Sequence, residues 1–453
     1  MRVLRMRRDP EFYSKLVKLA APMAIQQLLM SSLFIIDTII VSSLGDSYIA
    51  AVGQANQISL LMWCSFSAIA SGGAIFAAQY WGKNQDMDGV RRAFTGTMIF
   101  GGFIAFVFFV IAVFLNGPAM HILSKDPEVV AIGRSYLQIA GFAFIIQILS
   151  AMLSTILKAT GNTRISMIAS ISSVFTNIIL DFIMVYGYLG FPRLEEKGAA
   201  LATVVASVVD IVVMVLLARM AQAPITLRRR DFVRLEKGFM RQFIKIVMPI
   251  LTKDQLWALG MMLYSITFSY MGTSAIAAFT VFATVGGIVN IFFIAVGSAG
   301  GIIIGHLLGA ADIEKAKNYA WRLLRLMFVS GIVLCPILLF GRGILLIPFP
   351  NLSAEAIDYA KQAMLLTSFV IWAKGINFTN MDGILRAGGD TIAAAFIEIG
   401  ILWGIGVPFT MAAGMLLHLP FWQVFMMTCL EELIKAIAGT IRVSKYKWAK
   451  RLV

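Results

Sequence analysis

The chain has 453 residues, of which 59% are hydrophobic and only 14% are charged, and its formal net charge is +14. This composition excludes an ordinary soluble protein, which would carry far more charge at this length. Apolar runs of about 20 residues or more predict helices that cross a lipid hydrocarbon layer, and the strict alternation of a membrane β-barrel is absent.

Charged, Gly-rich or Pro-rich breaks divide the chain into twelve predicted spans. The first six are expected at 14–42, 48–80, 92–116, 132–157, 165–188 and 198–220. The second six are expected at 242–270, 275–308, 318–347, 357–385, 392–416 and 421–441. We therefore predict an all-α integral membrane protein in which a basic segment, 222–241, connects the two sets.

Lys and Arg are distributed unevenly among the loops between these spans. They gather in the N-terminus, in the 81–92, 158–164 and 310–317 loops, in the connector and in the tail. The alternate loops at 44–48, 271–275 and 416–421 contain neither residue. By the positive-inside rule, both termini are expected in the cytoplasm, with the chain in a bacterial-type inner (plasma) membrane. The same rule accounts for the positive charge, so no nucleic-acid partner is expected.

The two sets of spans repeat each other in sequence. The segment Pro22–Ala93 aligns with Pro249–Ala320 at a constant offset of 227, and the matches include Gly45 with Gly272. Later, residues 157–163 answer residues 385–391 at an offset of 228. Because six is an even number of spans, both halves start on the same side and form a parallel repeat. We predict two six-helix lobes, 1–221 and 242–453.

Parallel halves of this kind predict a secondary transporter. They form a cleft near the bilayer midplane, which opens to alternate sides as one half rocks against the other. The sequence contains no Walker-type Gly-Lys-Ser/Thr loop, so ATP is not expected as the energy source. We expect no cofactor and an H⁺ or Na⁺ gradient as the driving force.

An ordered set of motifs carries a resemblance to a known family. The set consists of Pro22 with Gln26 and Gln27, Asp37-Thr38, Leu44-Gly45, Gln79-x-x-Gly82, Leu157-x-Ala-x-Gly-Asn-Thr163, Asn177-x-x-x-Asp181, Gly198-Ala-Ala-x-Ala-Thr203 and Leu385-Arg-Ala-Gly-Gly-Asp-Thr391. The chain resembles the multidrug and toxic compound extrusion (MATE) family, in its bacterial and archaeal branch. The resemblance implies a V-shaped pair of six-helix lobes, present as a monomer. It also implies export of small organic, often cationic compounds in exchange for H⁺ or Na⁺.

Ionisable residues inside predicted spans are the candidate functional residues, because each costs roughly 2.5–3.5 kcal/mol to insert. Asp37 lies deep in the first span, and Asn177 and Asp181 share one face of the fifth helix. Their oxygens, with that of Thr203, suit Na⁺, and two neighbouring carboxyls equally suit a proton. The resemblance places these four residues at the cation site of the first lobe. The structural alternative is a hydrogen-bond cluster that only joins helices.

The repeat distinguishes these readings. At the second-half positions equivalent to Asp37, Asn177 and Asp181, the chain has Tyr264, Ile405 and Phe409. The acidic set is thus absent from the aligned positions of the second half. Ion coupling confined to the first lobe explains this difference better than a requirement of the fold does.

The second half has its own intramembrane charges, namely Asp254, Lys374 and Glu398. A Lys among two acids is typical of a buried ion-pair network. A direct role for these three residues in substrate binding is equally compatible with the sequence.

Three further polar residues lie in the first half. Asp210 follows Thr203 by seven residues, so the two share a helix face. It either extends the first-lobe site or ends near the cytoplasm. Gln26 and Gln27, in the first span, are lesser candidates for the same site.

Two other functions were weighed against antiport. A flippase for lipid-linked saccharides would need a strongly cationic cleft, whereas the intramembrane set is mostly acidic. A membrane-embedded enzyme would need a catalytic constellation, and His121, His306 and His418 lie far apart near span ends. We therefore assign no catalytic residues.

Overall fold

The computed structural model describes residues 10–349 and 352–453. Seven α-helices precede the connector: α1 (Pro10–Ser42), α2 (Asp46–Gly82), α3 (Met87–Val113), α4 (Asn116–Leu123), α5 (Pro127–Ala159), α6 (Thr163–Tyr186) and α7 (Glu196–Met220). Seven follow it: α8 (Lys237–Tyr270), α9 (Thr273–Gly309), α10 (Ile313–Gly341), α11 (Ala354–Phe378), α12 (Thr391–Ile401), α13 (Val407–Met411) and α14 (Phe421–Ser444). Short 3₁₀ turns are η1 (Tyr188–Gly190), η2 (Arg229–Asp231) and η3 (Ile344–Leu346).

The twelve predicted spans all correspond to helices in this part of the chain. Within the described residues, nine helices are long and apolar enough to cross a membrane. The other three predicted spans are the long helices α8, α11 and α14. The short α4 was not predicted. Only two residues separate it from the apolar helix α3, so the sequence shows no clear break between the two helices.

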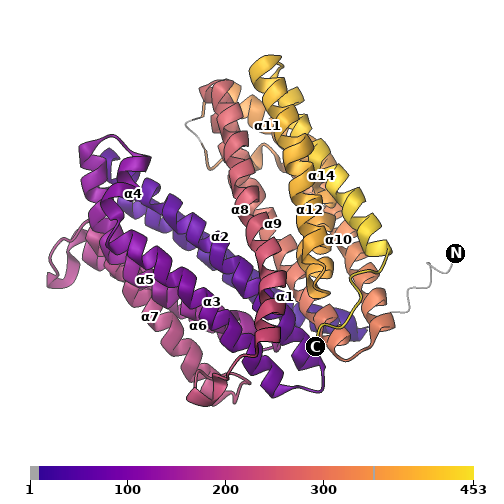
Figure 1. The fold of residues 1–453 in the computed structure, drawn as a ribbon. Helices are drawn as coiled ribbons and strands as arrows, with labels where there is room; N and C mark the ends of the chain where they lie inside the picture. The colour runs from indigo at the N-terminus through magenta and orange to yellow at the C-terminus, as the bar shows by residue number, and fades with distance from the viewer. Residues whose placement is uncertain (1–9, 350–351) are drawn as a thin grey trace. The chain divides into compact units, whose positions relative to one another are not determined.

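Contacts within the chain define two compact units. We call residues 25–255 the N-terminal unit, and residues 10–24 together with 256–453 the C-terminal unit. Helices α1 and α8 are therefore each divided between the units, whereas the predicted lobes end at the connector. In the N-terminal unit α5 packs on α2, α3 and α7, and α6 packs on α7 (Figure 1). In the C-terminal unit α11 packs on α9, α10 and α14.

The predicted repeat is visible in the helices themselves. Helices α2 and α9 both contain 37 residues and begin and end at equivalent positions. Gly45 and Gly272 precede them with φ of 128° and 118°, a backbone conformation that favours glycine. Asp86 and Asp312 cap the next helix in each half by accepting a backbone N–H. The same local structure therefore forms twice.

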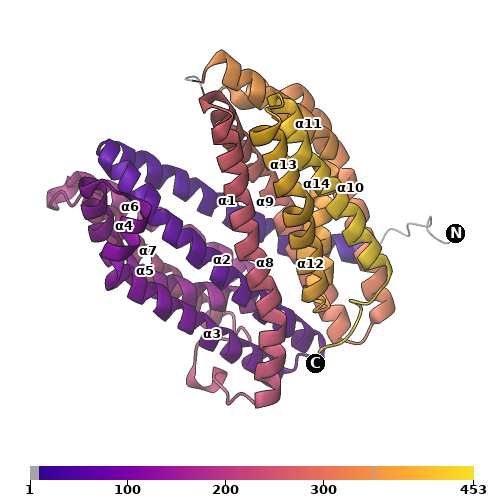
Figure 2. The same cartoon turned by 45° about the horizontal axis from the view of Figure 1, so that its top comes forward.

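The second half departs from regular α-helix in two of its spans. The predicted span 357–385 ends in a π-helical segment, η4 (Thr379–Leu385). The predicted span 392–416 is interrupted by η5 (Leu402–Gly406) and ends in η6 (Ala412–Leu416), both also π-helical. Figure 2 shows α12 and α13 following each other in one column beside α14. Such π segments are rare and often lie near functional sites.

Candidate functional site

Three helices of the N-terminal unit, α1, α6 and α7, bring the four predicted site residues together. Asn177 and Asp181, on α6, are each only 1% exposed. The carboxyls of Asp37, on α1, and Asp181 are close enough to share a hydrogen bond. Two carboxyls can share such a bond only when one of them holds a proton. We call Asp37, Asn177, Asp181 and Thr203 the acidic cluster.

Asn177 joins the members of the acidic cluster. With its amide nitrogen facing the carboxyls, it donates to Asp37 Oδ1 and Asp181 Oδ2, both at 3.1 Å. Its oxygen then accepts the backbone N–H of Thr203 on α7, at 3.2 Å. The Thr203 hydroxyl itself donates to Ala199 O at 3.0 Å. Thr203 thus meets the cluster through its backbone N–H.

One oxygen of the cluster is left without a donor. Asp181 Oδ1 is buried and, apart from any proton shared with the Asp37 carboxyl, receives no hydrogen bond from the described residues. Buried carboxyl oxygens in proteins are normally hydrogen-bonded. This oxygen is therefore available to a proton, a water or a cation.

Sequence reasoning missed Tyr136, which α5 adds to the cluster. The charges of both Asp37 and Asp181 act on its phenol group. Tyr136 also packs against the small apolar cluster of Ile40, Val41 and Val185. Its only sequence signal is a phenol near the start of a predicted apolar span, which does not show which helix it faces.

The remaining first-half candidates lie elsewhere in the N-terminal unit. Gln26 donates to the Ser170 hydroxyl at 2.7 Å and so joins α1 to α6. Gln27 is exposed. Asp210, on α7, accepts a hydrogen bond from Ser150 on α5 and interacts electrostatically with Lys158.

The predicted second-half charges have separate partners. Asp254 belongs to the N-terminal unit, where it pairs with the adjacent Lys253 at 3.1 Å. In the C-terminal unit, the ammonium of Lys374 lies 5.6 Å from the centre of the Phe282 ring, a cation–π distance. Glu398 acts electrostatically on Lys435. Lys253 and Lys435 were not predicted as partners.

The C-terminal unit contains a second buried polar cluster, centred on α14. Glu431 accepts a hydrogen bond from Tyr264 and forms an ion pair with Lys435, and both charged residues are about 5% exposed or less. Asn377 donates to the carboxylate and carbonyl oxygens of Glu432 at 2.6 and 2.9 Å. We call Tyr264, Glu431, Glu432 and Lys435 the paired cluster.

The paired cluster occupies the place of the acidic cluster in the repeat. In the repeat, Tyr264 is the equivalent of Asp37, and Glu431 is the equivalent of Thr203 at the offset of 228. The position-by-position comparison from the sequence missed Glu431, because its equivalent, Thr203, is not an acid.

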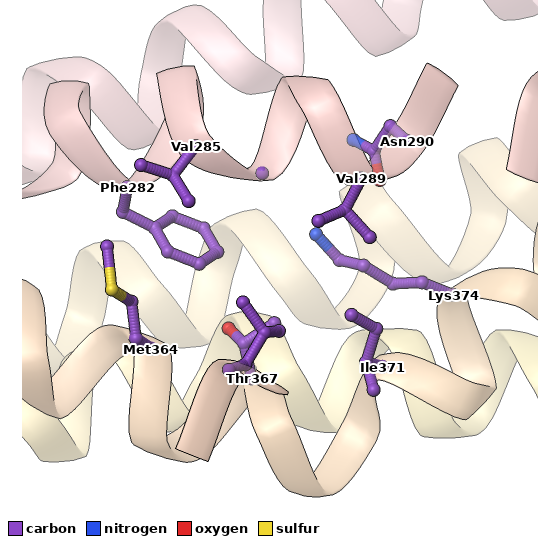
Figure 3. Close-up of a pocket in the computed structure, with 10 residues that line it drawn as sticks. Phe282, Val285, Val289, Asn290, Met364, Thr367, Ile371 and Lys374 are labelled. Carbon is purple, nitrogen blue, oxygen red and sulfur yellow. The ribbon is translucent and has the colours of Figure 1, made fainter. Parts of the chain in front are cut away.

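One small cavity adjoins the paired cluster, and a second cavity adjoins the first. The first has a volume of about 70 Å³ and is lined by Trp257, Lys374, Glu431 and Lys435, among others. The other, of about 10 Å³, shares Phe282 and Lys374 with it. Figure 3 shows Lys374 reaching from α11 toward Val289 on α9. These volumes suit water or a small ion and are too small for a drug-sized molecule.

The chain contains two repeated halves of membrane-spanning helices, and in one half two intramembrane carboxyls lie close enough to share a hydrogen bond. These features define the class of multi-pass membrane transporters with an internal duplication. The MatE family model matches residues 22–183 and again residues 249–412. The chain therefore belongs to the MatE family of multidrug and toxic compound extrusion transporters. The two matches begin at Pro22 and Pro249, where the predicted repeat begins.

Relatives and solved structures agree with this membership. The chain is 25% identical over 390 residues to the uncharacterized transporter YisQ of Bacillus subtilis (strain 168), covering 85% of this chain and 83% of that one. It is 24% identical over 401 residues to the multidrug resistance protein NorM of Burkholderia vietnamiensis, covering 86% and 85%. A crystal structure of the Vibrio cholerae MATE transporter VcmN in the bent form matches with a TM-score of 0.86 and 17% identity, over 96% of this chain and 97% of that one. The predicted all-α membrane fold is thereby confirmed, and the protein is a transporter rather than an enzyme.

Proposed function

We propose that this transporter is an antiporter that exports amphipathic, cationic organic compounds in exchange for an inward-moving cation. The observation that carries the proposal is the pair formed by the partly buried Asp37 and the buried Asp181, bridged by Asn177. Two carboxyls that share one proton keep a net negative charge inside the membrane unless a further proton or a Na⁺ ion binds. The names of several relatives as multidrug resistance proteins favour organic compounds as the exported substrates.

The cycle follows from this charge. The substrate binds from the cytoplasm, the protein turns outward, and a cation from outside occupies the acidic cluster and favours release of the substrate. The transporter then carries the cation inward by alternating access. One cation moving inward through roughly 150 mV supplies about 3.5 kcal/mol. A monovalent cationic substrate moving outward consumes the same amount, so in one-for-one exchange the concentration gradient of the coupling ion drives export. We propose that it acts as a monomer in the plasma membrane, with both termini in the cytoplasm.

The experiment compares the wild-type protein with Asp37→Asn in inverted vesicles. Ethidium transport is energised in turn by a pH gradient and by a Na⁺ gradient, which identifies the coupling ion. The variant is expected to lose gradient-driven transport while keeping the wild-type melting temperature. Normal transport by the variant under the gradient that drives the wild type would refute the proposal.

A further inference from the structure

Polar side chains continue from the acidic cluster along the interface of α5, α6 and α7. Ser207 lies one turn beyond Thr203 on α7 and donates to the Thr203 carbonyl at 2.7 Å. Ser173 lies one turn before Asn177 on α6 and donates to the Ala206 carbonyl, across the interface, at 2.8 Å. Figure 1 shows these helices running side by side. Hydroxyls thus extend from the cluster toward Asp210.

Asp210 is the only carboxylate of α7 between Thr203 and the helix end at Met220. It lies about 10 Å from Thr203 along the helix axis. Ser150, which is 2% exposed, donates to its Oδ2. Its Oδ1 is buried and accepts a hydrogen bond from no described donor. Asp210 therefore has a free acceptor position of the kind seen at Asp181.

The polar interface continues past Asp210 to the end of α5. Ser154 lies one turn beyond Ser150, and its hydroxyl is buried without a hydrogen-bond partner in the described structure. Ser166, on α6, donates to the Ser154 carbonyl at 3.3 Å. One turn further, Lys158 acts electrostatically on Asp210 and precedes the basic 158–164 loop.

The structural alternative is a buried Asp210–Lys158 ion pair that only joins helices. In such a pair the carboxyl oxygens are expected to be fully hydrogen-bonded. The interface instead leaves three buried oxygens unsatisfied, on Asp181, Asp210 and Ser154. Buried water typically occupies such positions and links them.

The second half of the chain shows that the fold itself does not need this carboxylate. At the repeat positions equivalent to Asp210 and Ser150, it has Ala438 and Phe378. The Asp210 carboxyl and its Ser150 donor are thus particular to the half that carries the acidic cluster.

The neighbouring charge distinguishes between the two coupling ions. A Na⁺ ion moving past Asp210 would approach the ammonium of Lys158, which repels it. Serine hydroxyls and intervening water can instead pass a proton, because each group accepts one proton and releases another. The lysine is therefore compatible with proton transfer and unfavourable for sodium passage.

We propose that Asp210 is a second proton-binding group. It lies on the path of the proton held by Asp37 and Asp181, and this path ends at the side of the N-terminal unit where Lys158 lies. This inference rests on the proposed antiport and assigns H⁺ as its coupling ion. The proton passes from one carboxyl to the next, so each returns to its starting state after a cycle.

The test uses Asp210→Asn in the full-length protein, reconstituted in liposomes with a pH-sensitive dye inside. Transport of ethidium driven by a pH gradient, with its associated proton flux, should fall roughly 10-fold or more. Exchange of ethidium for ethidium without a gradient should stay within about twofold of the wild type, because it needs no net proton movement. Asp210→Glu, which keeps a carboxyl group, should restore coupled transport.

A matched control is Ser172→Ala on α6, because within the described residues the Ser172 hydroxyl donates to the Ile168 carbonyl of its own helix. It should change neither transport nor exchange. If Asp210→Asn transports normally under a pH gradient while Asp37→Asn does not, the inference about Asp210 fails and the antiport proposal stands. If both variants transport normally, the antiport proposal itself fails. Loss of exchange together with coupled transport, or no recovery with Asp210→Glu, identifies a structural role and overturns the inference.

Discussion

The two buried clusters differ in how their charges are balanced. In the paired cluster, Lys435 compensates Glu431 directly, and Tyr264 satisfies the carboxylate further. In the acidic cluster, the charged group that acts on Asp37 is Asp181, among the residues that the structure describes. A balanced pair has no need of a further ion, whereas a pair of acids does. Equivalent positions of one duplicated fold are therefore suited to different tasks.

The balance in the paired cluster leads to a prediction for stability. Lys435→Met removes the cation but leaves Glu431 buried, so the free energy of unfolding should fall by about 3–5 kcal/mol. Adding Glu431→Gln removes the uncompensated charge, and the double variant should regain much of this loss. The measurement is thermal or denaturant unfolding of the purified protein in detergent.

The single variant Glu431→Gln completes the mutant cycle. Strictly additive effects of the two substitutions would show that the two side chains do not stabilise each other. Glu432 and Glu398 also act on Lys435, so the double variant is not expected to reach the full stability of the wild type.

The sequence predicted the residues of the acidic cluster better than it predicted their partners. Asp37 and Asp181 could be found because an acid inside an apolar span is rare. Tyr136 could not be assigned to the cluster, because a contact between helices depends on the rotation of each helix about its axis. In a membrane span, the residues that face lipid and those that face other helices are both apolar. The sequence therefore does not determine the rotation of each helix. Glu431 and Lys435 lie four residues apart on one helix, a spacing from which the sequence alone predicts their pairing.

At the scale of helices, span positions were predictable and their internal irregularities were not. Helix α2, Asp46–Gly82, extends the predicted 48–80 by only two residues at each end, because charged loops mark where a helix leaves the membrane. The π segments η5 and η6 have no comparable signal. Hydropathy is unchanged when a helix widens by one residue per turn, so the 392–416 span was expected to be continuous.

The close approach of α6 and α7 leads to a second prediction, at Gly198. A Cβ atom there would lie 2.8 Å from the backbone carbonyl of Met184, which cannot move aside as a side chain can. Gly198→Ala should therefore force the helices apart near the contact of Thr203 with Asn177, about 7 Å along α7. We expect a loss of stability of about 1–3 kcal/mol, measured as a lower melting temperature, and reduced coupled transport.

Gly102→Ala is the matched control for this substitution. Gly102 lies within α3, and a Cβ atom there would meet no heavy atom within 4 Å. The added methyl group should be neutral or slightly stabilising, because alanine favours a helix more than glycine does. Equal melting temperatures of the two variants would contradict the close-packing argument for Gly198.

At the scale of the molecule, the duplication and the compact units do not divide the chain at the same place. The repeat and the family matches place the second half at Pro249 and beyond. The boundaries between the two compact units instead lie at residues 24–25 and 255–256, within α1 and α8. Sequence composition marks the connector because it is basic and polar. It does not mark a boundary inside a continuous apolar helix, where only packing distinguishes the two parts.

The parallel repeat leads to a third prediction, on membrane topology. Because each half is expected to have six spans, loops at equivalent positions should face the same side of the membrane. Single cysteines at Gln85 and Ala311, in the loops after α2 and α9, should react with a membrane-impermeant maleimide only in inverted vesicles. Cysteines at Gly190 and His418, in the loops before α7 and α14, should react only in intact cells.

All four sites are exposed in the structure, so burial does not limit the reaction. The background is a variant in which Cys64, Cys335 and Cys429 are replaced by alanine and transport is retained. Labelling of residues 85 and 311 from opposite sides would mean that one half contains an odd number of spans, and the repeat would then be inverted rather than parallel. Labelling of both residues from outside would be consistent with a parallel repeat. It would, however, place the basic loops on the outer face, together with the Lys158 end of the Asp210 path.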